Sequence, residues 1–240
     1  MHSELLQYDI KIVPGLADHT GRLSIPDTCC LLQDAAATHA QMLGLGYYDL
    51  LKRDLYWLAV KTKIIFYSRP YLTDTVTMHT WPEAPGKLRC NRNYELTVNG
   101  ERAVAGRTEW AVLRISDGSL FRASDIYPED LVLTKGPVFS EPFVRIPEQF
   151  DDFENYYEYT VRSTDIDVGA HMNNVAYVRA LAGSFSCDEW DALEIKSIDL
   201  LYRNPAHEGD RLIFQKRNNE SSLDIRICRD DTTLLLAHIA

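Results

Sequence analysis

The sequence predicts an α+β protein built from two copies of one unit, each a long helix packed on an antiparallel sheet. Two observations support this prediction. A helix pattern followed by several extended segments appears twice in the same order, and single strands and helices do not alternate as they would in a parallel sheet. With 240 residues, 45% of them hydrophobic, the chain is long enough for two units that each bury a core.

The first unit opens with an extended run over residues 8–13. A helix follows, with Ser24 marking its start and Gly44 its end. The segments after it are rich in Val, Ile, Thr, Tyr and Trp, as expected for strands, and the pair Asn99-Gly100 between two of them is typical of a tight hairpin. The predicted strands cover residues 56–68, 73–81, 88–98 and 102–115.

The second unit repeats this order. An extended run over residues 156–162 leads into a polar loop. An apolar pattern at helical spacing then begins after Asn173 or Asn174, either of which is a good N-cap. Further strands are predicted at about residues 195–202, 211–216, 223–228 and 232–239.

We therefore expect one domain over residues 1–126 and a second over residues 156–240, paired as a pseudo-dimer. Between them, residues 127–155 are rich in proline and acids, which is typical of a linker that runs over the surface.

Counting back from Asp27 and Asn174 at the two helix starts aligns Asp18 with Asp165 and Ser24 with His171. In this alignment the first unit lacks the histidine, so chemistry is expected in the second unit alone.

The charge distribution disfavours nucleic acid as a partner. The formal net charge is −10, and the first 125 residues carry 14 basic and 14 acidic side chains, so the whole excess lies in the remainder. Nucleic acids are bound by clustered Lys and Arg. An acidic partner is better suited to the first half.

The sequence also predicts a cytoplasmic protein that does not enter a membrane. No segment approaches the roughly 20 apolar residues that span a bilayer, and the N-terminus lacks the basic start and apolar run of a signal peptide. Five scattered cysteines without zinc-ligand spacing predict reduced thiols and no metal site.

The most informative stretch runs from residue 165 to residue 177. It places Asp167, His171 and Asn173 directly before the second predicted helix. Backbone N–H groups at a helix start carry partial positive charge and can hold an oxygen that becomes anionic during acyl transfer. Asp, Asn and His are also ordinary capping residues, so the motif alone leaves both a structural and a catalytic interpretation open.

Six segments of the chain share the pattern of one known family: residues 25–40, 43–46, 57–60, 71–81, 99–113 and 165–177. Together they resemble the acyl-acyl carrier protein thioesterases. The resemblance implies two tandem hotdog domains and an enzyme that releases fatty acids from acyl carrier protein (ACP). It also implies that the loop before the second helix is the active-site loop.

The resemblance implies roles for individual residues of this loop. Asp167 would act as nucleophile or general base, and His171 would orient water, polarise the thioester carbonyl or act as base, with Asn173 beside it. The family's pattern has an asparagine at the position of Gly169.

The family's pattern also has a glutamate or cysteine where this chain has Pro205 and Ala206. Glu208 and His207 lie close by in the sequence and either could substitute for the missing group; Glu208 is taken as the candidate catalytic residue.

The expected reaction is hydrolysis of fatty acyl-ACP by activated water, without metal or nucleotide cofactor. An acyl tunnel is expected between the first helix and its sheet. Two alternatives stay open: acyl-coenzyme A as the substrate, and a binding module that has lost turnover. Acyl length and dimerisation are not given by the sequence. The residues named for the tunnel are Trp57, Leu58, Ile64, Ile65 and Phe66.

Overall fold

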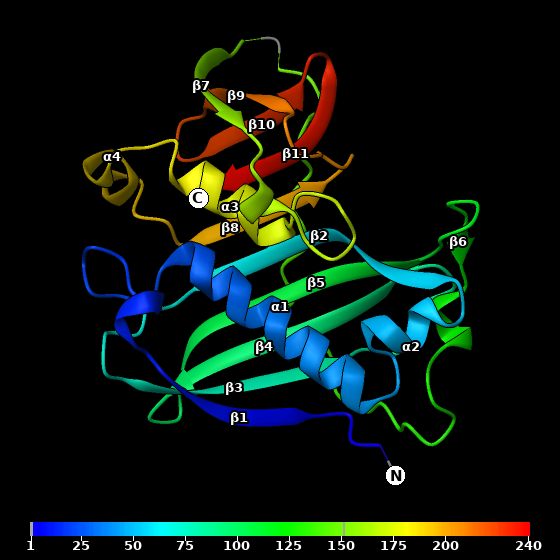
Figure 1. The fold of residues 1–240 in the computed structure, drawn as a ribbon. Helices are drawn as coiled ribbons and strands as arrows, with labels where there is room; N and C mark the ends of the chain where they lie inside the picture. The colour runs from blue at the N-terminus through cyan, green and yellow to red at the C-terminus, as the bar shows by residue number, and fades with distance from the viewer. Residues whose placement is uncertain (1, 151) are drawn as a thin grey trace. The chain divides into compact units, whose positions relative to one another are not determined.

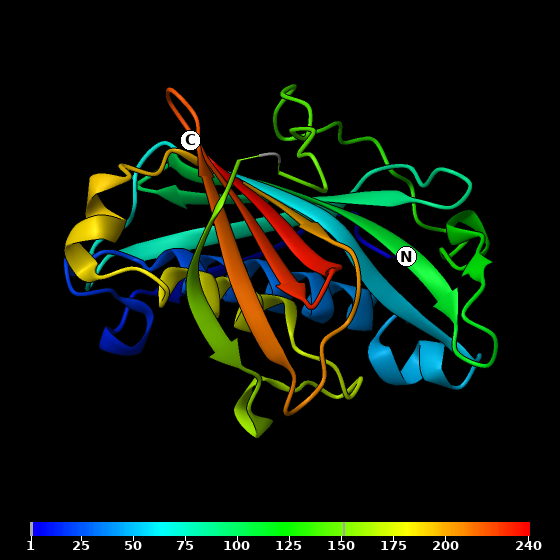
Figure 2. The same cartoon turned by 90° about the horizontal axis from the view of Figure 1, so that it is seen from above.

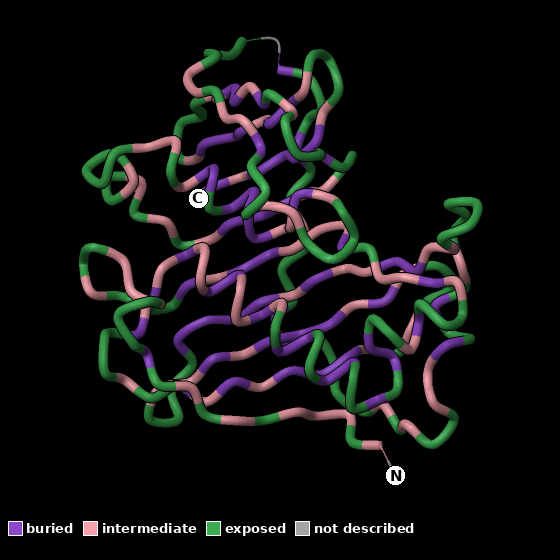
Figure 3. The backbone as a smooth tube through the Cα atoms, viewed as in Figure 1, coloured by how far each residue is buried: buried purple, intermediate pink, exposed green. Residues whose placement is uncertain are grey.

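The computed structural model describes residues 2–150 and 152–240. The chain divides into two compact units, one up to Glu141 and one from Pro142 onward. In each unit a helix lies on one face of an antiparallel sheet (Figure 1). Buried residues concentrate along the strands and the inner helix faces (Figure 3).

In the first unit the strand order is β1-β3-β4-β5-β2, antiparallel throughout, with the short β6 paired to β5. The Asn99-Gly100 hairpin between β4 and β5 is confirmed, because both residues have the positive φ of a tight turn (52° and 83°). The elements are β1 (Leu6–Lys11), α1 (Ile25–Met42), α2 (Tyr47–Leu51), β2 (Leu55–Phe66), β3 (Thr75–Pro82), β4 (Cys90–Val98), β5 (Glu101–Arg114) and β6 (Leu120–Phe121).

The helix α1 forms as the sequence predicts. The Oγ of Ser24 accepts a hydrogen bond from the N–H of Asp27 at 2.9 Å and caps the first turn. Gly44 ends the helix with a φ of +68°. The helix approaches β5 closely at Gly106, where a Cβ would lie only 2.7 Å from the Cδ1 of Leu32.

Under α1 the first unit buries a histidine that is fully hydrogen-bonded. Arg92 on β4 donates to the Nδ1 of His39 at 2.9 Å, so the proton sits on Nε2, which donates to the carbonyl of Ser3 at 3.0 Å. Burial, together with the Arg92 charge, lowers the pKa of His39 to about 4. His39 is therefore a structural residue in its neutral form.

This buried histidine should make stability pH-dependent. The imidazole titrates near pH 6.5 in an unfolded chain. Below that pH His39 takes up a proton in the unfolded state but stays neutral in the folded state. The free energy of unfolding therefore falls as the pH drops from 6.5 toward 4. Between pH 7.5 and pH 5 the His39 contribution should fall by about 2 kcal/mol.

Urea unfolding of the wild type and of His39→Gln at both pH values measures this contribution. Glutamine offers an acceptor to Arg92 and a donor to Ser3 but does not titrate, so the variant should lose about 2 kcal/mol less over this interval. An equal loss in the two proteins would show that His39 is not the source.

In the second unit the strand order is β8-β11-β10-β9-β7, again antiparallel. The helix α3 packs on this sheet, with the rings of Tyr177 and Tyr202 6.4 Å apart. The elements are β7 (Glu154–Thr160), α3 (Asn174–Ala182), α4 (Cys187–Ala192), β8 (Ser197–Tyr202), β9 (Arg211–Asn218), β10 (Leu223–Arg229) and β11 (Thr232–Ile239).

The described residues of the proline-rich segment between β6 and β7 form no regular helix or strand apart from a short 3-10 turn, yet the segment is not simply a surface linker. Val138 and Phe139 are buried against Trp81 and Ala105 of the first sheet. Since Gly106 faces α1, Ala105 faces the opposite side, so this part of the segment covers the sheet face away from the helix (Figure 2).

The second unit shows the same arrangement. Ile146 and Phe150 pack with Leu201 and Leu236, whereas the neighbouring Tyr202 faces α3. The segment therefore supplies an outer apolar layer to each sheet in turn.

The five cysteines are free thiols, and burial raises the pKa of Cys29 to about 12. No described helix is both long and apolar enough to cross a bilayer. Within residues 2–150 and 152–240, no cluster of His, Cys, Asp or Glu has the arrangement of a metal site.

Candidate active site

The loop before α3 is closed by backbone hydrogen bonds that place Asp167 beside His171. The N–H of Asp167 donates to the carbonyl of His171 at 2.9 Å, and the N–H of Ala170 donates to the carbonyl of Asp167 at 3.0 Å. A bridge between Ile166 and Met172 extends this pairing outward. The predicted association of the two residues is therefore present in the structure.

The side chains of Asp167 and His171 converge on one point above Gly169. A Cβ at Gly169 would lie 3.1 Å from the Oδ1 of Asp167 and 3.7 Å from the Nδ1 of His171. The loop residues from Asp167 to Ala170 are exposed, and His171 is half-buried. Because Gly169 has no side chain, the two polar groups border a space that solvent can reach.

Neither the Asp167 carboxylate nor the His171 imidazole is paired with a charged side chain of the described residues. The Oδ1 of Asp167 accepts one hydrogen bond, from the N–H of Gly169 at 2.8 Å, and no Lys or Arg of the described chain pairs with it. The His171 imidazole makes no hydrogen bond to any described residue. An acid and an imidazole that are both available to solvent could share one water molecule.

Asn173 has a structural role. Its Oδ1 accepts from the N–H of Val175 at 2.8 Å, which makes Asn173 the N-cap of α3. The start of α3 therefore has the predicted cap, and the Asn173 side chain is used in holding the junction between the loop and the helix.

The turn that carries Glu208 is bonded to the loop before α3, but Glu208 makes no hydrogen bond to the His171 imidazole in the described structure. The N–H of Met172 donates to the carbonyl of Ala206 at 2.8 Å, which joins the loop to the turn after β8. Glu208 lies exposed in that turn, and no hydrogen bond connects it to His171 in the described structure. The residue of this turn that contacts the His171 ring is His207, with ring centroids 5.0 Å apart.

The first unit contains the same loop. Its bridge joins Ala17 and Leu23, the N–H of Asp18 donates to the carbonyl of Arg22 at 2.8 Å, and the N–H of Gly21 donates to the carbonyl of Asp18 at 2.9 Å. These bonds repeat those around Asp167 one by one. The matching residues are therefore Asp18 with Asp167, Thr20 with Gly169, Gly21 with Ala170, Arg22 with His171, and Ser24 with Asn173.

This match corrects the alignment that the sequence suggests, which set Asp18 on Asp165 and Ser24 on His171. That alignment is two residues out because it matches Asp27 with Asn174, whereas the two residues that correspond are the N-caps Ser24 and Asn173. The conclusion that the first unit lacks the histidine still holds, since its counterpart is Arg22.

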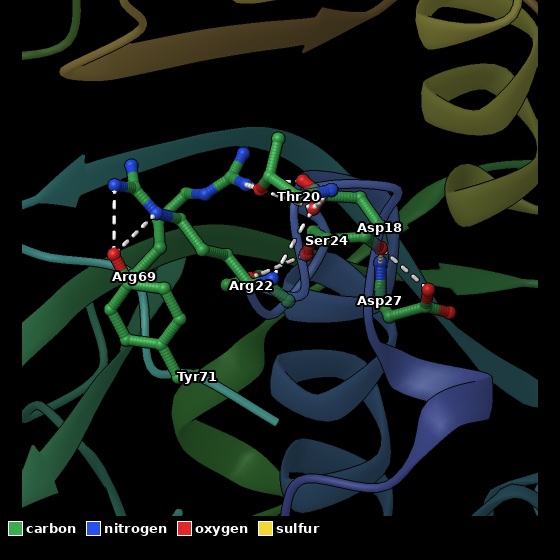
Figure 4. Close-up of polar contacts among 8 residues, drawn as sticks. Asp18, Thr20, Arg22, Ser24, Asp27, Arg69 and Tyr71 are labelled. Carbon is green, nitrogen blue, oxygen red and sulfur yellow. Dashed lines mark hydrogen bonds and ion pairs between the residues drawn. The ribbon is translucent and has the colours of Figure 1, made fainter.

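In the first-unit loop the carboxylate of Asp18 is fully engaged by neighbouring side chains and backbone (Figure 4). The carboxylate of Asp18 accepts from the N–H of Thr20 at 2.9 Å and from the Thr20 hydroxyl at 2.6 Å, and it forms an ion pair with Arg69. The corresponding positions in the second unit are Gly169 and Pro205, which provide neither a hydroxyl nor a cation. Because of the replacements at these two positions, the Asp167 carboxylate lacks the hydroxyl donor and the positive charge that bind the Asp18 carboxylate.

One position of the loop stores backbone strain. Ala170 has a φ of +60°, whereas its first-unit counterpart is Gly21 with a φ of +74°. A left-handed conformation costs a residue with a Cβ about 1–2 kcal/mol, and the extra freedom of glycine in the unfolded chain offsets part of this. We expect Ala170→Gly to raise the free energy of unfolding by about 0.5–1 kcal/mol, measured by urea denaturation; a lower value would contradict the assigned strain.

The residues named for a tunnel do not share one face. Trp57 packs near the end of α1 and donates from Nε1 to the carbonyl of Leu45 at 2.9 Å. Ile65 packs in the cluster on the opposite face of the sheet, and Leu58 is 40% exposed. Ile64 and Phe66 are buried. These five side chains therefore do not line a single channel.

Two family models match successive parts of the chain. The acyl-ACP thioesterase N-terminal domain matches residues 5–120, and the acyl-ACP thioesterase C-terminal domain matches residues 149–235. The chain belongs to the acyl-ACP thioesterase family.

Curated relatives agree with this membership. Oleoyl-acyl carrier protein thioesterase 2 of Arabidopsis thaliana is 26% identical over 200 residues, which is 75% of this chain and 54% of the relative. The palmitoyl-acyl carrier protein thioesterase of Cuphea hookeriana is also 26% identical over 200 residues, covering 78% of this chain and 48% of the relative. The chain thus spans about half the length of the relatives it matches.

Solved structures share the fold. An acyl-ACP thioesterase from Bacteroides thetaiotaomicron superposes with a TM-score of 0.84 at 18% identity, covering 98% of this chain and 97% of that one. The 12:0-ACP thioesterase from Umbellularia californica gives 0.79 at 20% identity, covering 100% and 97%. The predicted α+β architecture of two tandem hotdog domains is confirmed.

The sequence offers His207 only beside Glu208, as a substitute for the family's missing acid, and Glu208 is the one taken as the candidate catalytic residue. The only signal for it was its place three residues before Asp210 in a turn near the family's missing acid, and that spacing gives no reason to prefer it to Glu208. Its contact with His171 depends on the fold of two segments that lie far apart in the sequence.

Proposed function

We propose that this chain is a thioesterase that hydrolyses fatty acyl-ACP to a free fatty acid and the carrier protein. Membership of the acyl-ACP thioesterase family supports this assignment. The single observation that assigns the reaction to particular residues is that the side chains of Asp167 and His171 both face the open space above Gly169. In this role the protein would end chain growth in fatty acid biosynthesis.

The proposed reaction begins with a water molecule held between Asp167 and His171. His171 removes a proton from this water as the oxygen attacks the thioester carbonyl carbon, and Asp167 orients the water and stabilises the imidazolium by its charge. The resulting tetrahedral intermediate expels the carrier thiolate. That thiolate takes the proton back from His171, which leaves a fatty acid and a free thiol.

The start of α3 is placed to stabilise the negative charge of the intermediate. Asn173 uses its side chain on Val175, so the N–H groups of Asn174 and Ala176 in the first turn keep no bond to a described residue outside the helix. These N–H groups carry the positive end of the helix dipole, which favours an oxyanion.

Thiol release from purified acyl-ACP of several chain lengths tests the proposal. The wild type should release free thiol well above the rate without enzyme, and His171→Gln should not. Release that is the same in both proteins would refute the proposed site, and no release from any acyl-ACP would refute the proposed function.

Acyl-coenzyme A of the same chain lengths gives the second arm of this experiment. If ACP is the carrier, its acidic surface should bind basic side chains of this chain, so KM for acyl-ACP should rise with salt more steeply than KM for acyl-coenzyme A. Faster turnover of acyl-coenzyme A at every salt concentration would assign that carrier instead. Binding of acyl-ACP without thiol release would identify a binding module.

A further inference from the structure

The His171 imidazole lacks the hydrogen-bonded partner that normally orients a catalytic base. In many enzymes a third group holds the base by a hydrogen bond to its second ring nitrogen. No described residue does so for His171, and its one side-chain ring contact is with His207, at 5.0 Å between centroids and 66° between ring planes. This edge-to-face arrangement is a favoured geometry for aromatic rings.

The backbone around His207 is held firmly in place. The N–H of His207 donates to the Oδ2 of Asp210 at 2.9 Å, and Arg229 from β10 pairs with the same carboxylate. Partial burial opposes ionisation of Asp210, but the hydrogen bond from His207 and the Arg229 charge together lower the pKa of that carboxyl. Ala206, directly before His207, is bonded to the active-site loop through Met172.

The repeat shows that this contact belongs to the architecture of the loop. In the first unit the N–H of Tyr71 donates to the Oδ2 of Asp74 at 2.8 Å, as His207 does to Asp210, so Tyr71 matches His207. Arg22, the counterpart of His171, donates to the Tyr71 hydroxyl at 2.9 Å and lies over its ring at 5.2 Å. Both units therefore pack these two positions together, and only the second unit places an imidazole at each.

We propose that His207 is a positioning residue for His171. Its ring packs against the His171 imidazole and holds it toward Asp167 across Gly169, and no described side chain orients this imidazole by a hydrogen bond. The inference rests on the proposed hydrolysis at this loop and adds to it a residue that acts through His171. Charged groups face the pair from three elements: Asp167 on the loop, Asp210 on the turn, whose Oδ2 lies 3.9 Å from the Nδ1 of His207, and Arg229 on β10, which pairs with Asp210; Glu208 follows His207 in the chain.

Two variants separate ring packing from other roles. His207→Ala removes the ring and should lower kcat roughly tenfold or more with KM changed less than about threefold, because small misplacements of a catalytic group are costly. His207→Phe keeps an aromatic ring without a titrating nitrogen and should restore kcat to within about threefold of the wild type. Thermal unfolding of both variants verifies that they fold.

Tyr71→Ala is the matched control, since it removes the equivalent ring in the first unit and should leave kcat within about twofold of the wild type. A kcat for His207→Ala within twofold of the wild type would overturn the proposal. So would an equal loss in His207→Ala and His207→Phe, because the imidazole itself would then be required.

Proton NMR of the histidine rings tests the contact independently of activity. The Hε1 resonance of His171, assigned by its loss in His171→Gln, should shift in His207→Ala, since the ring current of His207 is removed. An unchanged resonance would overturn the proposal even if the enzyme is active. If the wild type hydrolyses no thioester, the proposed function fails, whereas the NMR result still decides whether His207 holds the His171 ring.

Discussion

Replacing Asp167 by asparagine should lower kcat by at least about 100-fold, the range lost when a positioned acid or base is removed. Asparagine retains the Oδ1 that accepts from the N–H of Gly169, so the turn should survive. It carries no negative charge, however, and can neither accept a proton nor stabilise an imidazolium on His171. Thiol release at saturating acyl-ACP measures kcat, and thermal unfolding shows whether the fold is intact.

Asp165→Asn is the matched control, because it removes a carboxylate two residues away in the same loop. The Oδ2 of Asp165 accepts from the Tyr159 hydroxyl at 2.8 Å and from the N–H of Arg162 at 2.7 Å, so this acid is structural. We expect the variant to lose stability and to keep kcat within a few-fold of the wild type. A kcat loss in Asp165→Asn equal to that in Asp167→Asn would mean that loop rigidity, not the Asp167 charge, limits the reaction.

Replacing His171 by glutamine should lower kcat by about 100- to 1,000-fold. Glutamine has a similar reach but cannot take up the proton that water gives as it attacks. KM should change little, because the proposed role is confined to the reacting water. Steady-state kinetics on acyl-ACP provide both constants. A variant with raised KM and unchanged kcat would instead place His171 among the groups that bind the substrate.

The long elements of this chain could be predicted because local and global signals agree in them. Ser24 caps α1 and Gly44 ends it, while Asn99-Gly100 fixes the hairpin between β4 and β5. These signals depend on a few residues in direct sequence contact, so they can be recognised without knowledge of the packing.

The short helices α2 and α4 could not be predicted in the same way. They contain five and six residues, which is too short for an apolar period to repeat. Ser186 and Glu189 do form a capping box at α4, and this was the one local signal that could have been recognised.

The candidate site was only partly predictable for a related reason. Asp167 and His171 lie four residues apart in one turn, so their association follows from local sequence. The role of Asn173 as the cap of α3 is local as well. By contrast, the approach of His207 to His171 depends on a turn more than thirty residues away, and only the folded backbone brings the two rings together.

The central claim is that chemistry takes place in the loop of the second unit and not in its counterpart in the first. The most direct measurement is the rate of thiol release from one acyl-ACP by Arg22→Gln and His171→Gln, which make the same replacement at matched positions. The account predicts that Arg22→Gln retains kcat within about twofold of the wild type and that His171→Gln loses at least about 100-fold. Equal losses in the two variants, or a larger loss for Arg22→Gln, would contradict it.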